Sequence, residues 1–123
     1  MDREKFDMLV EKALEKIPAQ FKSRLDNIHI VVQDLPDESD LAGARVRNRY
    51  NLLGLYSGVP YSRRGVDYGL YPVLPDRIKL FKENIERTCR TEEEIEERVE
   101  EVLIHEVAHY FGMTDEEIRK AGY

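Results

Sequence analysis

The chain has 123 residues, enough for one domain with a modest core, and its 41% of hydrophobic residues favours a folded protein over a disordered one. Its formal net charge of −6 argues against general nucleic-acid binding, and no apolar run is long enough to cross a membrane. The charged N-terminus lacks the apolar stretch of a secretory signal, and a single cysteine excludes an internal disulfide, so we expect a cytoplasmic protein.

The first half of the chain predicts a helix followed by two strands. Apolar residues recur at three- and four-residue spacing over residues 6–17, which is typical of an amphipathic helix that ends near Pro18. IHIVVQD (28–34) is rich in β-branched residues and precedes the turn-forming cluster LPDESD, so it predicts a strand. LLGLYSG (52–58) predicts a second strand, whose glycines allow another backbone to come close.

The second half predicts a loop, a third strand and two helices. Residues 61–76 form a long loop with glycines and prolines, and RIKLFK (77–82) predicts the third strand. Residues 91–111 predict one long helix, and residues 114–123 a short last one. This order predicts a single α+β domain over the whole chain. In it, the long helix and the N-terminal helix pack on a small sheet of three to four strands.

Capping residues mark the ends of the two predicted C-terminal helices. Thr91 and Glu94 have capping-box spacing at the start of the long helix. Gly112 stands where a left-handed residue is favoured beyond its end. Thr114 and Glu117 repeat the same box before the last helix.

The long helix carries the sequence His105-Glu106-Val-Ala-His109, an H-E-x-x-H pattern in an otherwise apolar stretch. Burying these three polar side chains without partners would cost several kcal/mol, which a divalent cation would offset. Histidines one helical turn apart can both reach one ion, and the glutamate, about 100° around the helix, can reach a water on it. The pattern therefore predicts two metal ligands and a general base. The alternatives are a core helix with two satisfied histidines and a purely structural metal.

A catalytic zinc needs a third protein ligand, and Asp115 is our candidate. Gly112 allows the chain to reverse after the helix and to bring Asp115 back beneath the metal. Asp115 also has an ordinary explanation, as an acid in the first turn of the last helix, where its charge suits the helix dipole. Glu116 and Glu117 are the fallback ligands.

The pattern His105-Glu-x-x-His109-x-x-Gly112-x-x-Asp115 resembles the zincin metallopeptidases in which aspartate replaces the third histidine of the metzincins. Together with LLGLYSGVPYSRRG, LPDRIKLFK and HEVAHYFGMTDEE, it is similar to the minimal zincin-like zinc metallopeptidases of bacteria, long described only as a domain of unknown function. The similar segments run from about residue 52 to 117, roughly half of the chain, in the order of the family.

The resemblance implies a compact α+β zincin core that binds Zn²⁺. By position it makes His105 and His109 ligands, Glu106 the base and Asp115 the third ligand. Two departures matter: the metzincin position has no third histidine, and only eight residues follow Asp115, too few for the methionine-containing turn of metzincins. In larger zincins a C-terminal subdomain forms a wall of the cleft. Here that wall must come from the arginine-rich loops or from a partner, or be missing.

Substrate binding is predicted at the strand LLGLYSG, because in zincins an edge strand pairs with an extended substrate. A plain packed strand is the alternative. Residues 41–66 contain five arginines and no acid, so arginines that line the cleft would favour acidic or phosphorylated peptides. A mobile, solvated loop is the alternative for these arginines. An arginine or a loop tyrosine (Tyr61, Tyr68 or Tyr71) is our candidate for holding the oxyanion. The candidate substrate residues are Leu53, Gly54, Leu55, Tyr56, Arg63 and Arg64.

These observations predict a small zinc-dependent peptidase that acts on a peptide or protein substrate. The alternative is a zinc-binding regulatory or protein-interaction module of zincin fold with little proteolysis of its own. Hydrolysis of a non-peptide amide is a third reading, because zinc-activated water attacks many carbonyls. We expect neither nucleic acid nor membrane as a partner. The sequence leaves the oligomeric state open.

Overall fold

The computed structural model describes residues 1–26, 28–57 and 76–122. Its sheet contains β1 (His29–Gln33), β2 (Gly54–Ser57) and β3 (Arg77–Phe81) in the order β1–β3–β2. The central strand β3 runs parallel to β1 and antiparallel to β2. The predicted α+β class with a small sheet is therefore confirmed, and β2 forms one edge of the described sheet.

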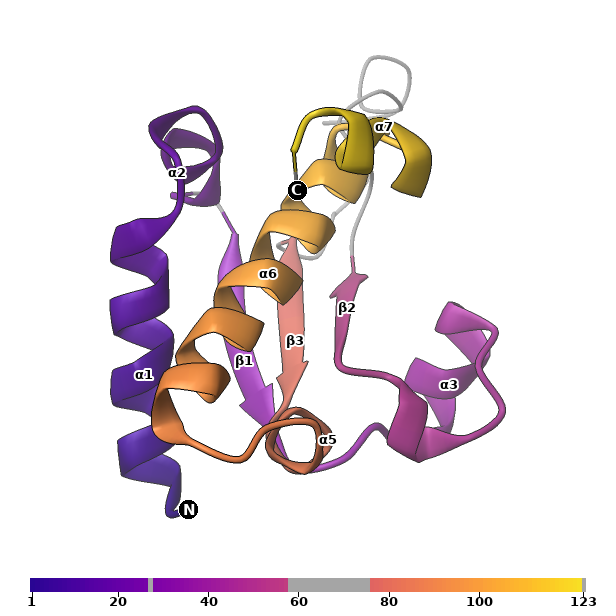
Figure 1. Ribbon diagram of the computed structural model, residues 1–123. Coiled ribbons are helices and arrows are strands. Elements are labelled where there is room, and N and C mark those ends of the chain that lie inside the picture. Colours follow the sequence, from indigo (N-terminus) through magenta and orange to yellow (C-terminus); the bar gives the residue numbers. More distant parts are fainter. Residues whose placement is uncertain (27, 58–75, 123) are drawn as a thin grey trace.

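Helices surround this sheet, and the longest of them crosses one of its faces (Figure 1). α1 and α6 pack against each other on that face, and α7 follows the end of α6. In the described part of the chain, no helix has both the length and the hydrophobicity of a membrane span. The helices are α1 (Arg3–Lys16), α2 (Ala19–Leu25), α3 (Glu38–Ala44), the 3-10 turn η1 (Arg49–Asn51), α5 (Lys82–Arg87), α6 (Glu92–Tyr110) and α7 (Asp115–Lys120).

The core lies between the sheet and the pair formed by α1 and α6. Alternate residues of β3, Ile78 and Leu80, are fully buried beneath α6, as expected for a strand with period two. The helices contribute buried residues at three- and four-residue spacing, and each Val, Leu, Ile or Phe among them stabilises the fold by about 1.5–3 kcal/mol. The helical residues include Phe6, Leu9, Val10 and Ala13 of α1 and Ile95, Val99, Val102, Leu103 and Val107 of α6.

Capping residues fix the position of α6 and of the chain that follows it. The Thr91 hydroxyl accepts a hydrogen bond from the Glu94 N–H at 3.1 Å, which confirms the predicted N-cap. The Glu94 carboxylate accepts from the Arg90 N–H at 2.5 Å instead of from the cap residue, so the return bond of the predicted box is absent. Gly112 has a φ of 78°, the left-handed conformation predicted for it. The chain therefore turns sharply after α6 and starts α7.

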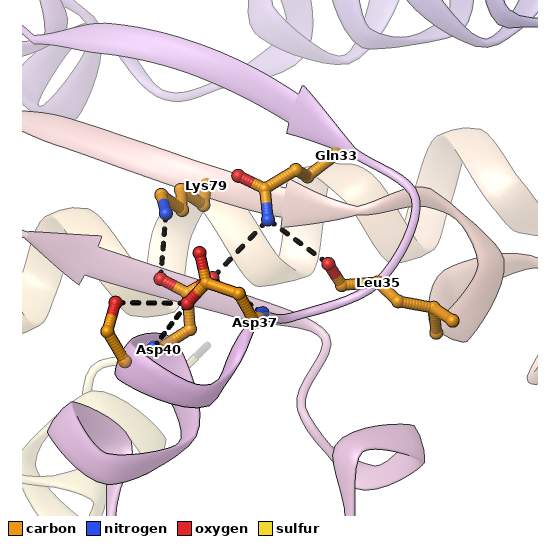
Figure 2. Close-up of polar contacts among 6 residues, drawn as sticks. Gln33, Leu35, Asp37, Asp40 and Lys79 are labelled. Carbon is orange, nitrogen blue, oxygen red and sulfur yellow. Dashed lines mark hydrogen bonds and ion pairs between the residues drawn. The ribbon is translucent and has the colours of Figure 1, made fainter.

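The cluster LPDESD, predicted as a turn, instead starts α3. Asp37 caps this helix and forms a capping box with Asp40, whose carboxylate accepts from the Asp37 N–H at 3.1 Å. Asp40 also pairs with the Lys79 ammonium at 2.7 Å and accepts from the Gln33 amide at 3.3 Å (Figure 2). Lys79 alternates with the buried residues of β3, so α3 is held to the sheet face opposite α6.

The helix α5 was also not predicted. It begins directly after β3, which ends one residue earlier than the predicted strand RIKLFK. Lys82 begins α5, and its ammonium lies 3.0 Å from the Glu86 carboxylate one turn later. The six residues of α5 are too few to show a helical period in the sequence.

Candidate metal centre

The residues His105, Glu106 and His109 lie on the last two turns of α6. The Glu106 side chain is 16% exposed, but the His109 side chain is 41% exposed. The buried face of this part of the helix is formed by Val107, Ala108 and Tyr110 instead. The prediction that all three polar residues are buried is therefore wrong for His109, and desolvation alone does not require a metal there.

The carboxylate of Glu106 is anchored to the edge of the sheet. The Phe81 N–H donates to the Leu53 carbonyl at 3.0 Å, so in this antiparallel ladder the backbone groups of Tyr56 point away from β3. The Tyr56 N–H donates instead to Glu106 Oε2 at 3.0 Å. This bond fixes the orientation of the Glu106 side chain against β2.

A glycine allows α6 to come this close to β2. A Cβ atom on Gly54 would lie 2.5 Å from the Cγ1 atom of Val102 and 3.3 Å from the carbonyl oxygen of Lys79. The sequence predicted the close approach of another backbone at a glycine of this strand, but the nearest neighbour of Gly54 is a side chain of the helix. Further along the strand, the rings of Tyr56 and Tyr110 meet edge to face, with centroids 5.3 Å apart.

His109 lies between two carboxylates. Its Nε2 atom is 3.0 Å from Asp115 Oδ1, and its Nδ1 atom is 3.8 Å from Glu106 Oε2. The interaction with the Glu106 side chain, joined by that with Asp115, raises the pKa of His109 to about 9, although partial burial opposes this. The contact with Asp115 is a hydrogen bond, whereas the longer one with Glu106 is an attraction between charges. The imidazole in turn lowers the pKa of the Asp115 carboxyl. The arrangement stabilises positive charge at this position.

Asp115 is also the first residue of α7. The Thr114 hydroxyl caps that helix by accepting from the Glu117 N–H at 3.2 Å, as predicted. The side chain of Asp115 is 76% exposed and remains available to His109. The two explanations given for Asp115, a first-turn acid and a partner of the histidine site, are therefore compatible.

The donor atoms of His109 and Asp115 fit a zinc ion in both type and spacing. Two ligands about 2.0 Å from one tetrahedral ion are separated by about 3.3 Å. The observed separation of the two donor atoms is 3.0 Å. Over residues 1–26, 28–57 and 76–122, however, no three His, Cys, Asp or Glu side chains are arranged to hold a metal. The structure thus brings together Glu106, His109 and Asp115, and the charge of His105 also helps to lower the pKa of the Asp115 carboxyl.

The half-buried His105 lies between two hollows in the surface. One, of about 330 Å³, is also lined by Glu97, Glu100 and Glu101 of α6. The other, of about 280 Å³, runs between α6 and the start of β2, and its lining includes Glu106. The second hollow adjoins the anchored carboxylate and is where a substrate can approach it.

A family model described as zincin-like metallopeptidase matches residues 25–123. The chain belongs to the zincin-like metallopeptidase family. This confirms the resemblance found in the sequence. A search of curated proteins found no match. For this zincin-like protein, the family indicates zinc as the cofactor and peptide hydrolysis as the class of reaction.

The predicted substrate residues of the zincin-like protein do not all lie at this site. Leu53 and Gly54 line the hollow that reaches Glu106, and Tyr56 contacts Glu106 through its N–H. Leu55 lines a separate hollow with Lys79, on the face of the sheet that carries α3. The remaining candidates, Arg63 and Arg64, and the oxyanion candidates Tyr61, Tyr68 and Tyr71 lie outside the described residues.

One contact at the site was not predicted from the sequence. Glu106 meets the backbone of Tyr56, and a backbone N–H carries no residue-specific signal. The only indication was the predicted edge position of the strand, which exposes a row of backbone donors and acceptors.

Proposed function

We propose that the protein is a zinc-dependent peptidase in which His105, His109 and Asp115 hold the ion and Glu106 is the general base. The observation that supports this most directly is the position of the Glu106 carboxylate, between His109 and the edge strand β2. When bound, zinc would polarise a carbonyl group and lower the pKa of water.

The ligand set combines one pair that is already close with the other histidine of α6. His109 and Asp115 already have donor atoms 3.0 Å apart. His105 lies one helical turn before His109, a spacing at which both rings can reach one ion. His105 would therefore complete a set of two imidazoles and one carboxylate, with a position left for substrate.

Glu106 would move the proton during hydrolysis. One of its oxygens accepts from the Tyr56 N–H, which orients the carboxylate toward the hollow beside β2. The carboxylate would accept a proton from the attacking water and return it to the leaving amine. The outward-facing backbone groups of Gly54 would pair with an extended peptide, as exposed strand edges commonly do.

The test is the variant Glu106→Gln, assayed with an unfolded protein as substrate. We expect about one zinc per chain in both proteins, because the glutamate is not a ligand in this scheme. We expect hydrolysis to fall about 10²- to 10⁴-fold in the variant, the usual contribution of a general base. Wild-type activity should disappear with a chelator and return with zinc. Glu93→Gln, at an exposed residue in the first turn of α6, is the matched control. A Glu106→Gln variant that stays active would remove Glu106 from the mechanism.

A second candidate function is a zinc-binding interaction module with little turnover. The exposure of the site favours it, since the side chains of His109 and Asp115 are 41% and 76% exposed. Catalytic sites usually exclude water more completely. Zinc-loaded protein that cleaves neither unfolded proteins nor a peptide library, yet binds zinc stoichiometrically, would favour this module over the peptidase.

A further inference from the structure

The 3-10 turn η1 lies between the candidate site and a second hollow. Its last residue, Asn51, lines the hollow of about 280 Å³ that reaches His105 and Glu106. Its other two residues, Arg49 and Tyr50, line a hollow of about 550 Å³ together with the start of α3. A bound ligand that extends from the candidate site along the segment before β2 would therefore contact the side chains of η1.

The turn is fixed to the core by a buried asparagine of α5. Asn84 is fully buried, and its amide donates to the carbonyl groups of Arg49 at 2.5 Å and Leu52 at 2.7 Å. At the start of η1, the Asn48 side chain accepts from the Tyr50 N–H at 3.0 Å. The backbone that carries Arg49 and Tyr50 is thus held at both ends, which reduces the entropy lost when a ligand binds.

Arginines gather around an exposed aromatic ring on this turn. The guanidinium carbon of Arg87 lies 4.1 Å from the ring centroid of Tyr50, and that of Arg49 lies 5.6 Å from it. Tyr50 is 42% exposed, and Arg47 lines the adjoining hollow. Within the part of the chain that the structure describes, these three arginines have no carboxylate partner at ion-pair distance. Their charge is therefore available to a ligand.

The hollow beside η1 carries both charges, because Asp37 and Glu38 line it together with Arg47 and Arg49, and the excess of positive charge lies around Tyr50. The chain has a net charge of −6, and the hollow on the other side of His105 is lined by glutamates of α6. Tyrosine and arginine are the residues most enriched among binding hot spots, and a guanidinium pairs with a carboxylate through two parallel hydrogen bonds. The chemistry of this surface matches a flexible chain that carries several carboxylates.

We propose that Arg47, Arg49, Tyr50 and Arg87, the arginine–tyrosine cluster, bind an acidic segment of the substrate while its scissile bond lies at Glu106. That the occupant is a peptide substrate rests on the proposed peptidase function. The cluster confers a preference for protein chains with an acidic stretch next to the cleaved bond. The preference comes from side chains outside the candidate metal centre.

The first test measures binding without catalysis, in the Glu106→Gln background. Fluorescence anisotropy compares a labelled ten-residue peptide rich in Asp and Glu with its Asn and Gln counterpart. We expect tighter binding of the acidic peptide, and weaker binding as salt is raised. The double variant Arg47→Gln/Arg49→Gln should bind the acidic peptide about 2- to 30-fold more weakly, the value of two exposed ion pairs.

A matched control loses the same charge elsewhere. Lys12 and Lys22 are exposed residues of α1 and α2, which lie beyond β1 from the cluster (Figure 1). The variant Lys12→Gln/Lys22→Gln should bind the acidic peptide as the parent does, and thermal unfolding checks that both variants are folded. Equal loss in the two double variants, or equal affinity for the two peptides, overturns the proposal. Tighter binding of a single-stranded oligonucleotide of equal charge overturns the peptide as the occupant.

The second test measures cleavage by the protein with Glu106 intact. Two substrates share an uncharged scissile segment and carry either an acidic or a neutral flank. We expect Arg47→Gln/Arg49→Gln to raise KM for the acidic substrate with kcat unchanged and to leave the neutral substrate unaffected. Cleavage of both substrates with equal kcat/KM overturns the cluster and leaves the peptidase standing. Acidic-peptide binding that depends on the cluster, without cleavage of either substrate, would support the binding surface and contradict the proposed peptidase function.

Discussion

Asp115 has two roles, one in the helix α7 and one in the candidate metal centre. As the first residue of α7 it places a carboxylate where the helix dipole favours negative charge. The same carboxylate contacts His109 at 3.0 Å because the left-handed Gly112 turns the chain back after α6. One side chain thus contributes to the local stability of α7 and to the candidate metal centre.

Replacing Asp115 should separate these two contributions. We expect Asp115→Ala to weaken zinc binding at least about tenfold, because loss even of an outer-shell partner of a metal ligand costs about 10- to 100-fold in affinity. The stability of the fold should change by less than about 1 kcal/mol, since the side chain is largely exposed. Competition with a chromogenic chelator measures the first effect and urea unfolding the second.

The neighbouring residue Glu116 provides the control for this substitution. Its side chain is 71% exposed on the same short helix, and its carboxylate lies 3.5 Å from the Lys120 ammonium. Glu116→Ala should keep the zinc affinity of the wild type. Unchanged affinity in Asp115→Ala, with a loss in Glu116→Ala or Glu117→Ala, would transfer the role of third ligand to one of the fallback residues.

At the scale of elements, the sequence predicted the long helices from their apolar period, and it missed helices that are short and are held by contacts distant in the chain. α6 was predictable from its apolar period and from its caps at Thr91 and Gly112. α3 was not, because its seven residues show no period and Asp40 is held by Lys79, far along the chain. In the site, the spacing of the histidines could be recognised in the sequence. The contact of Glu106 with a backbone N–H fifty residues earlier could not be predicted from it.

The contact between β2 and α6 depends on the absence of a side chain at Gly54. We expect Gly54→Ala to lower the free energy of unfolding by about 1–3 kcal/mol, the usual effect of overpacking, because its Cβ would overlap Val102. Separation of the helix from the strand should also weaken the bond between Glu106 and Tyr56 and reduce activity. Urea unfolding measures the stability of the variant.

Two further variants show whether this loss comes from the contact with the helix. Gly43→Ala places a Cβ in open space in α3, so it should be neutral or stabilise by up to about 1 kcal/mol. Val102→Ala removes the atom that Gly54→Ala meets, so the double variant should lose less stability than the sum of the two single variants. Strict additivity, or a Gly54→Ala variant as stable as Gly43→Ala, would contradict the packing argument.

At the scale of the whole molecule, the core and the candidate metal centre are separate structures. The hydrophobic core joins α1, α2, the sheet and α6, and none of His105, Glu106, His109 or Asp115 belongs to it. Small domains that fold only around zinc lack such a core, and their metal binding energy is their folding energy. Because this core is large, we expect the chain to fold without the metal and zinc to add stability to the folded state.

Removal of zinc should therefore lower the melting temperature without unfolding the protein. A ligand at one hundred times its dissociation constant adds about 2.7 kcal/mol to the folded state. For a chain of this length that corresponds to a shift of about 10 °C. Calorimetry of zinc-loaded and chelator-treated protein measures it, and His109→Ala should remove the shift but keep a cooperative transition. A chelated protein without such a transition would mean that the metal organises the core, and the separation of core and site would then be wrong.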